Sequence, residues 1–372
     1  MRHILLTGAT GTIGSALVPQ LLASRDTTVS LLMRAADTTE LLARHGKMLA
    51  YWGYAPGDAD AARLKPLLGD ISLPSFGWSE SDFADHALRH THIIHCAASV
   101  KLNMPLEQAR ATAVLPTRSI LALARLGKAA KIDLVSTVGV WGRTPGHMPE
   151  RALPEVSDFH NTYEAAKAEA ERVVWAEGQG LPITLHRPSM VVGDAKSGQV
   201  IHFQVFYHLC EFLSGRRTFG VMPDLGQTRL DTIPVDWVAA VICWANQRTD
   251  TAGQIYHLCS GPQQAISLVQ LQHKVRAAWA GHGLPLPKLR GVNRRWLERL
   301  IPLIGALAGA KTRRALRGLS PVLEYLAEDQ GFANQRTASA LAAAGLPVPA
   351  LENYLDQVIA YYLSRTYPDT KP

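Results

Sequence analysis

The sequence predicts an α/β fold, with a doubly wound parallel sheet followed by a smaller, mainly helical lobe. Two observations lead to this prediction. In the first half of the chain, short apolar runs alternate with segments of helical periodicity, which is typical of parallel strands joined by helices. After Arg187 and Pro188 the alternation is lost, and an irregular stretch with several aromatic residues follows. We therefore expect the sheet to come first and a separate lobe to begin after it.

The expected strands are apolar runs at residues 4–7, 29–33, 65–69, 92–96, 132–136 and 183–187. A helix over residues 235–246 and a last strand over residues 255–259 return the chain to the sheet, and a helical tail begins at Leu268. Pro19 lies inside the first expected helix. Because proline has no backbone N–H to donate, we expect this helix to lose a hydrogen bond and to kink there.

A glycine-rich turn separates the first expected strand from the first helix. Gly8, Gly11 and Gly14 are spaced three apart within it. In such a turn the first glycine makes the bend, the second lets the backbone approach a pyrophosphate, and the third lets the helix pack closely on the strand. The phosphates then bind free amides at the helix N-terminus. This segment therefore predicts a dinucleotide cofactor.

The end of the second expected strand distinguishes between two such cofactors. In an NAD site an acidic residue there accepts a hydrogen bond from the ribose 2′-hydroxyl, but this chain has Arg34. A guanidinium binds phosphate and cannot accept from a hydroxyl, so the residue favours the 2′-phosphate of NADP. Asp37, three residues further on, is the alternative that would favour NAD.

A tyrosine and a lysine predict proton transfer. Tyr163 and Lys167 lie one helical turn apart on the same face. A nearby cation favours the phenolate, so we expect Lys167 to bring the tyrosine pKa towards the operating pH. The expected strand at 132–136 ends at Ser136 and Thr137, which places their hydroxyls at the carboxyl edge of the sheet, where such folds bind ligands. A surface helix can carry the same pair without any function, and this alternative stays open.

The composition is that of an ordered globular enzyme, with 47% hydrophobic and 19% charged residues in a chain of 372. Cys96, Cys210, Cys243 and Cys259 are far apart and lack metal-ligand spacing, so we expect reduced thiols, no metal site and a cytoplasmic protein. The first residues do not resemble a secretory signal, and the apolar stretch at 300–310 is too short to span a bilayer.

The formal net charge is +7, and basic residues crowd one late segment. They are Lys288, Arg290, Arg294, Arg295, Arg299, Lys311, Arg313, Arg314 and Arg317. The segment has no nucleic-acid motif, so we expect an acidic partner such as a carrier protein or a phosphate-bearing coenzyme. Peripheral contact with a membrane and a solvated helical face are the alternatives.

Several motifs, in this order, resemble those of extended short-chain dehydrogenases/reductases. They are residues 7–14, 69–71, 95–99, 136–140, Tyr163 with Lys167, 187–188 and 234–236. Within that superfamily, residues 32–35, Arg44, the spacing from Asp70 to Gly77, and Glu171 are similar to the thioester reductase and fatty acyl-CoA reductase branch, the male-sterility type. The resemblance covers roughly residues 1–260.

The resemblance implies a role for each matching residue. Tyr163 becomes the proton donor, Lys167 tunes it and holds the nicotinamide ribose, and Thr137 is the second donor to the substrate oxygen, with Ser136 as the alternative. NADP(H) would be bound by Gly8, Thr10, Gly11, Thr12, Ile13, Gly14, Arg34, Arg44, Asp70, Ile71, Ala97, Ala98, Ser99, Ser136, Tyr163, Lys167, Pro188 and Val191. The chain departs from the family at Ala113, where an asparagine often serves a water relay.

The resemblance also implies a function. We expect an NADPH-dependent reductase that converts an acyl thioester to an aldehyde. The acyl group would be held on coenzyme A or on an acyl carrier protein supplied in trans. Whether the aldehyde is then reduced to an alcohol stays open. The alternatives are a sugar-nucleotide epimerase or dehydratase, a sterol-type hydroxy dehydrogenase, and a cofactor-sensing regulator without turnover.

The expected domains follow the same division. Residues 1–189 form the NADP-binding domain, completed by about 229–260, whereas residues 190–228 and 261–372 form the substrate lobe. We expect an aromatic group in that lobe to line an acyl tunnel with a cationic mouth, namely Phe203, Phe206, Tyr207 and Phe212.

Overall fold

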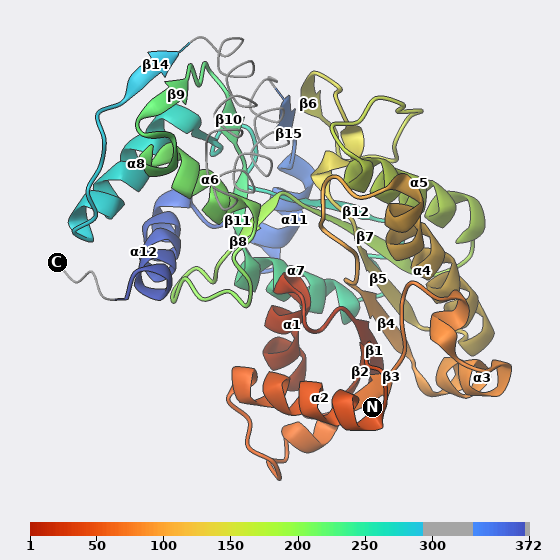
Figure 1. The fold of residues 1–372 in the computed structure, drawn as a ribbon. Coiled ribbons are helices and arrows are strands. Elements are labelled where there is room, and N and C mark those ends of the chain that lie inside the picture. The colour runs from red at the N-terminus through yellow and green to blue at the C-terminus, as the bar shows by residue number, and fades with distance from the viewer. Residues whose placement is uncertain (293–329, 369–372) are drawn as a thin grey trace.

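The computed structural model describes residues 1–292 and 330–368, with a parallel sheet at its centre (Figure 1). The sheet has seven strands in the order β12-β7-β5-β4-β1-β2-β3. They are β1 (Arg2–Thr7), β2 (Thr27–Met33), β3 (Leu64–Leu68), β4 (His92–His95), β5 (Lys131–Val135), β7 (Ile183–Pro188) and β12 (Ile255–Leu258). All seven predicted strands are present, with ends that shift by a residue or two, so the predicted fold class is confirmed.

Helices cover both faces of the sheet. Figure 1 shows α1 (Thr12–Leu22), α2 (Thr38–Trp52) and α7 (Val235–Asn246) on one side. The opposite side carries α3 (Glu80–Arg89), α4 (Leu106–Gly127) and α5 (Thr162–Glu177). Side chains alternate along each strand, so Ile4 and Leu6 of β1 enter one hydrophobic core while Leu5 enters the other.

Pro19 lies inside α1, as the sequence predicts, and its side chain is exposed. A proline cannot donate to the carbonyl four residues earlier, which belongs to Ser15. The indole Nε1 of Trp52, on α2, donates to that carbonyl at 2.8 Å instead. A neighbouring helix thus satisfies the acceptor that Pro19 leaves without its usual partner.

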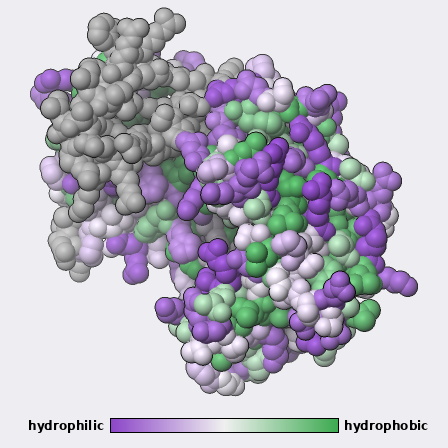
Figure 2. All heavy atoms as spheres, turned by 45° about the vertical axis from the view of Figure 1, so that its right-hand side comes forward, coloured by the Kyte–Doolittle hydropathy of each residue, from purple (hydrophilic) through white to green (hydrophobic). Residues whose placement is uncertain are grey.

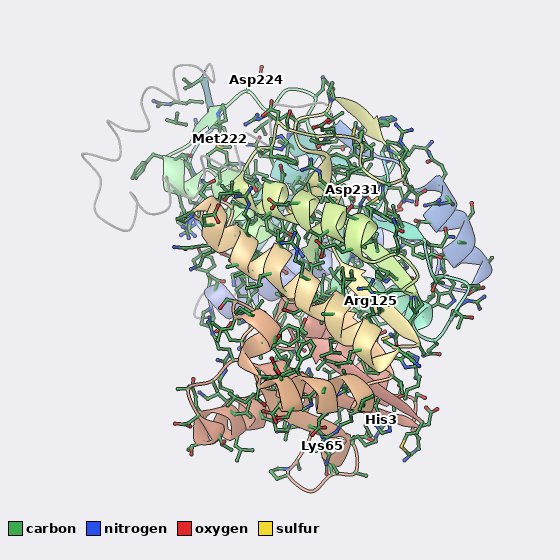
Figure 3. All side chains as sticks on the ribbon, turned by 90° about the vertical axis from the view of Figure 1, so that its right-hand side faces the viewer. His3, Lys65, Arg125, Met222, Asp224 and Asp231 are labelled. Atoms are coloured by element: carbon green, nitrogen blue, oxygen red, sulfur yellow. The ribbon has the colours of Figure 1, made fainter. Side chains whose placement is uncertain are left out.

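A second hydrophobic core lies beyond the sheet. It is built mainly from α6 (Val205–Leu213), α8 (Leu268–Gly281) and α12 (Leu355–Thr366). Short strand pairs border it: β8 (Met190–Val192) with β11 (Thr232–Pro234), β9 (Val221–Pro223) with β14 (Arg290–Val292), and β10 (Arg229–Leu230) with β13 (Ile266–Ser267). In Figure 3, Met222 and Asp224 of this lobe lie at the opposite end of the molecule from His3 and Lys65 in the sheet.

The chain returns to the sheet near its C-terminal end. Strand β15 (Gln330–Phe332) pairs in parallel with β6 (Gly146–Met148). Helix α11 (Gln335–Ala343) then places Leu341 in the same core as α1 and α7. The predicted domain division stays a prediction; α11, which it assigns to the substrate lobe, shares the core of the sheet.

Short 3₁₀ helices complete the described elements: η1 (Ala61–Arg63), η2 (Pro74–Gly77), η3 (Val138–Trp141), η4 (Arg216–Thr218) and η5 (Leu351–Asn353). The four cysteines are free thiols. Among residues 1–292 and 330–368, no helix combines the length and apolar character that crossing a membrane requires. On the face shown in Figure 2, hydrophobic areas are small and broken up by hydrophilic residues.

Most of the predicted basic cluster falls in a stretch about which the structure gives no information. Lys288 and Arg290 are described, whereas Arg294 through Arg317 and the apolar stretch at 300–310 lie outside the described residues. The predicted role of that segment therefore stays a prediction.

Candidate active site

A cavity of about 960 Å³ opens at the carboxyl ends of the sheet strands, where open parallel sheets bind ligands. One wall comes from the segments that follow β1, β2, β3, β4, β5 and β7, and the other comes from the second lobe. Every residue predicted to bind the cofactor or to act in catalysis lines this single cavity. The structure thus brings the whole predicted set together, while the role of each residue stays a prediction.

The turn after β1 fits a dinucleotide phosphate. Gly8 has a φ of +82°, and a Cβ on it would lie 2.7 Å from the backbone nitrogen of Ala97. A Cβ on Gly14 would lie 2.1 Å from the carbonyl oxygen of Gly8. At the start of α1, the hydroxyl of Thr12 is buried without a hydrogen-bond partner among the described residues. A helix N-terminus beside an unpaired donor is suited to an anionic oxygen.

Two arginines lie where β2 ends. Arg34 is 74% exposed in its side chain, and its Nη1 lies 4.0 Å from Oδ2 of Asp70. Nη1 of Arg44 donates to the carbonyl oxygen of Arg34 at 2.5 Å. Asp37 is not among the cavity residues, because its carboxylate caps α2 by accepting from the backbone nitrogen of Glu40 at 2.8 Å. The acidic alternative from the sequence thus serves a helix end.

Tyr163, Lys167 and Thr137 meet deeper in the cavity. Asn161 caps α5 by accepting from the backbone nitrogen of Glu164, which sets Tyr163 on the first turn. A hydrogen bond joins the hydroxyls of Tyr163 and Thr137. Nζ of Lys167 donates to the carbonyl oxygen of Val135, the last residue of β5, at 2.8 Å.

Burial is the largest influence on the pKa values of Tyr163 and Lys167. It raises the pKa of Tyr163 to about 12, against the hydrogen bond with Thr137, which lowers it. Burial also lowers the pKa of Lys167 to about 8. The expected lowering of the Tyr163 pKa by Lys167 is therefore wrong for this structure. Loss of water around the phenol raises the pKa, and the negative charge of the neighbouring Glu164 raises it further. Together these two effects outweigh the hydrogen bond from Thr137, which lowers it.

A buried ion pair fixes α5 against β7. Nε of Arg187 donates to Oε1 of Glu171 at 2.9 Å, and Nη2 donates to Oε2 at 2.5 Å. Their side chains are 0% and 2% exposed. The sequence analysis named both residues only as marks of a family. The structure shows that they hold the helix of Tyr163 and Lys167 to the strand that ends at Pro188.

His160 and Glu164 were missed by the sequence analysis. His160 lines the cavity, and its Nδ1 lies 2.9 Å from Oε2 of Glu164. The pattern of Asn161 followed three residues later by a glutamate predicts a capping pair on a helix surface. The carboxylate is instead fully buried. Nothing in the local pattern separates these two outcomes.

The second lobe supplies a mostly apolar wall. Its residues and those facing it include Leu102, Met104, Met190, Val205, Phe206, Leu209, Leu230 and Phe332. The predicted aromatic tunnel is only partly present, because Phe206 alone of that group lines the cavity. Tyr207 and Phe212 are instead buried in the second core, and Phe203 packs against that core with its ring edge-on to Tyr207.

One carboxylate interrupts this wall. Asp231, labelled in Figure 3, lies between the two ends of the molecule and accepts from the backbone nitrogens of Ser260 and Gly261, each at 2.9 Å. Burial raises the pKa of Asp231 to about 6. These bonds tie the second lobe to the turn that follows β12.

Comparison with known proteins agrees with this architecture. The family described as male sterility protein matches residues 6–242. The crystal structure of the terminal R domain from the myxalamid PKS-NRPS biosynthetic pathway is 28% identical, with a TM-score of 0.85, and the match covers 100% of this chain and 93% of that chain.

Curated relatives are longer proteins. Isonitrile lipopeptide synthase of Streptomyces coeruleorubidus is 30% identical over 261 residues, which are 68% of this chain and 17% of the synthase. Aldehyde reductase lnaA of Aspergillus flavus is 27% identical over 389 residues, covering 97% of this chain and 36% of that protein. The chain therefore matches only a minor part of the length of these curated relatives.

Proposed function

Because the chain belongs to the male sterility protein family, within the extended short-chain dehydrogenase/reductase oxidoreductases, we propose that it is an NADPH-dependent reductase of acyl thioesters that releases an aldehyde. One observation carries this proposal. A single cavity joins the glycine turn and the two arginines at one end to Thr137, Tyr163 and Lys167, and continues along an apolar wall. In this proposal the cofactor, the proton-donating side chain and the acyl chain lie next to one another in one cavity.

The cofactor end favours NADPH over NADH. Two cationic side chains, those of Arg34 and Arg44, lie together beyond the end of β2, and Asp37 is engaged as a helix cap; this supports a 2′-phosphate on the proposed cofactor. When bound, NADPH supplies the hydride of the reaction. The chain binds and orients it through the glycine turn, the residues after β4 and Pro188, in the proposed set given above.

The side chains of the proposed triad supply the proton and the hydrogen bonds. Tyr163 stays protonated across the neutral range, since its pKa is about 12, and it donates its proton to the carbonyl oxygen of the substrate. Thr137 donates a second hydrogen bond to that oxygen. Both bonds strengthen as negative charge develops there, which stabilises the transition state more than the ground state. Lys167 holds the nicotinamide ribose.

A thioester is the proposed substrate because the chain resembles an R domain of a PKS-NRPS pathway along its whole length, and a lipopeptide synthase along two thirds of it. The apolar wall suits an acyl chain. The arm that carries it is supplied in trans, on an acyl carrier protein or coenzyme A, and Lys288 and Arg290 are the described members of a cationic segment that would face it.

A substrate panel tests this function. Purified protein is incubated with NADPH and acyl thioesters of coenzyme A, pantetheine and a loaded carrier protein, and the products are identified by mass spectrometry. We expect NADPH oxidation matched by aldehyde. A parallel incubation contains sugar nucleotides, and their interconversion without net oxidation of NADPH would instead support the epimerase alternative.

The proposed triad makes a sharper prediction. Tyr163→Phe keeps the ring and removes the proton donor, so we expect turnover to fall by roughly 10²–10⁴ while NADPH affinity persists. Steady-state kinetics and NADPH titration by fluorescence measure the two effects. Full activity in this variant would remove Tyr163 from the mechanism.

A further inference from the structure

Two cationic side chains in the described wall of the cavity belong neither to the proposed 2′-phosphate site nor to the proposed triad. They are those of Lys101 and Arg229, and both residues are exposed. Neither forms an ion pair with a described residue. A cation that lines a cavity without a counter-charge is available to an anionic ligand.

Arg229 is fixed by the strand pair to which it belongs. In the antiparallel pairing of β10 with β13, Arg229 lies opposite Ser267. Nη1 of its guanidinium donates to the carbonyl oxygen of Ala265, which also lines the cavity, at 2.7 Å. The other donors of this guanidinium have no partner among the described residues. The side chain is thus anchored by one bond and keeps donors that match the oxygens of a phosphate.

The pairing of the next strand limits how far Arg229 lies from the cofactor side of the cavity. Thr232, three residues after Arg229, pairs with Met190 of β8. Met190 lines the cavity two residues after Pro188, which is proposed to bind the cofactor. Three residues of chain span at most roughly 11 Å. A pantetheine arm is longer than this between its sulfur and its phosphate, so a thioester held at the proposed triad can extend its arm to Arg229.

The charges near Arg229 also favour an anion. Asp231, placed between the two ends of the molecule in Figure 3, is the nearest carboxylate along the chain, and it accepts from two backbone nitrogens. No ion pair joins it to Arg229 within the described part of the chain. Lys288 and Arg290 do not line the cavity. Arg229 is therefore the arginine that the described part of the second lobe presents to an arm inside the cavity.

Resting on the thioester reduction proposed above, we propose that Arg229 binds the phosphate of the substrate's pantetheine arm. Coenzyme A and a loaded carrier protein both carry this phosphate, whereas a simple pantetheine thioester lacks it. The phosphate takes no part in the chemical step, so the contact lowers KM and leaves kcat unchanged. Arg229 thus selects thioesters with a phosphorylated arm over those without one.

Two thioesters that differ only in this phosphate test the proposal. The same acyl group is offered on pantetheine and on phosphopantetheine, to the unmodified protein and to Arg229→Gln. We expect a lower KM for the phosphorylated ester in the unmodified protein, and a rise of about tenfold in that KM in Arg229→Gln. The KM of the pantetheine ester and both kcat values should stay the same. Added salt should narrow the preference of the unmodified protein, because it screens an exposed charge.

Two variants separate the place of Arg229 from the loss of a positive charge. Arg365→Gln makes the same change at an exposed arginine of α12 that does not line the cavity, and both KM values should stay unchanged. Arg229→Lys keeps the charge without the planar donors, so it should retain part of the preference. Urea unfolding checks that each variant is folded.

A binding measurement tests the phosphate contact without turnover. Free phosphopantetheine and free pantetheine are titrated calorimetrically into the unmodified protein and Arg229→Gln, each saturated with NADP. Tighter binding of phosphopantetheine to the unmodified protein alone is expected. Equal binding of the two compounds by the unmodified protein, or an unchanged preference in Arg229→Gln, would overturn the role of Arg229. So would a preference that is lost in Lys101→Gln instead. Failure of the unmodified protein to reduce either ester would refute the proposed function, whatever the titrations show.

Discussion

At the scale of the residue, the two proposed acid–base groups are shifted in opposite directions by the same cause. Burial raises the pKa of Tyr163 to about 12 and lowers that of Lys167 to about 8, because each group loses more solvation in its charged form. At neutral pH the phenol keeps the proton that it is proposed to donate. Lys167 is positively charged at neutral pH and loses this charge as the pH rises through about 8.

This difference predicts a single alkaline limb. The value of kcat/KM reports the ionisation of the free enzyme, so it should fall as pH rises through about 8, where Lys167 loses its proton. Tyr163 should contribute no fall before about pH 12. Lys167→Arg stays charged throughout, so we expect a lower but pH-independent rate. A flat profile in the unmodified protein, or an unchanged limb in Lys167→Arg, would contradict this assignment.

Arg34 makes a second prediction at this scale. Its side chain is 74% exposed, so a charge-assisted bond to a 2′-phosphate should contribute only about 1.5 kcal/mol. We therefore expect Arg34→Ala to narrow the preference for NADPH over NADH by about tenfold. Calorimetric titration of both cofactors measures it, with Arg89→Ala, an exposed arginine on α3, as the control. Equal affinities in the unmodified protein would remove the NADPH assignment.

Some of these residues could be predicted from the sequence and others could not. Gly8 and Gly14 belong to one local motif, whose spacing predicts that neither position has room for a side chain. The structure shows this, because a Cβ at either position would clash with backbone atoms. The pKa of Tyr163 depends on burial by residues far away in the chain, which a helical-turn pattern does not report. His160 and Glu164 look like the approach to an ordinary capped helix.

At the scale of the element, α5 carries the chemistry on one face. Tyr163, Lys167 and Glu171 follow one another at intervals of four residues, so they lie along one stripe of the helix. The first two face the cavity, and the third pairs with Arg187 of β7. The ion pair thus sets the position of the helix relative to the sheet edge.

Removing one partner of this pair should be costly. Glu171→Gln leaves the guanidinium of Arg187 buried without its counter-charge, so we expect the free energy of unfolding to fall by about 3 kcal/mol. The matched control is Glu177→Gln, whose carboxylate pairs with Arg118 at about half exposure and should lose less than about 1 kcal/mol. Urea unfolding measures both. Equal losses of unfolding free energy in the two variants would show that the buried ion pair stabilises the protein no more than the exposed one.

The long elements were predictable and the short ones were not. Six of the seven sheet strands are mostly buried runs, whereas the edge strand β3 buries only Leu64. Helix α7 has its predicted bounds, because local hydrophobic patterns report such long elements. Strands such as β6 and β15 have three residues each. Their pairing joins segments far apart in the chain, and three residues are too few to show a strand period.

At the scale of the whole molecule, the cavity depends on segments from both ends of the chain. Gly8 follows β1, whereas Gln330 and Phe332 belong to β15 and line the same cavity. Helix α11 then anchors the C-terminal segment on the sheet core through Leu341. The sequence analysis predicted two lobes but placed this return in the second, because nothing local marks which core a short amphipathic helix joins.

Because α11 packs on the core of the sheet, we expect a substitution in this C-terminal helix to destabilise the protein. Leu341 is 0% exposed, so Leu341→Ala should cost about 2–5 kcal/mol of unfolding free energy and should weaken NADPH binding only as the folded fraction falls. Leu126→Ala, at a leucine on α4 that is 51% exposed, should change stability by less than about 0.5 kcal/mol. An unchanged urea midpoint in Leu341→Ala would show that α11 is not part of this core.

Transfer of a labelled hydride tests the central claim most directly. The unmodified protein is given NADPH carrying deuterium at the transferred position, together with an acyl-pantetheine thioester, and the carbonyl product is trapped and analysed by mass spectrometry. The account predicts one deuterium on the former thioester carbon of the aldehyde, released with one equivalent of free thiol for each NADPH oxidised. Free thiol without deuterated aldehyde, or no NADPH oxidation although the cofactor binds, would contradict it.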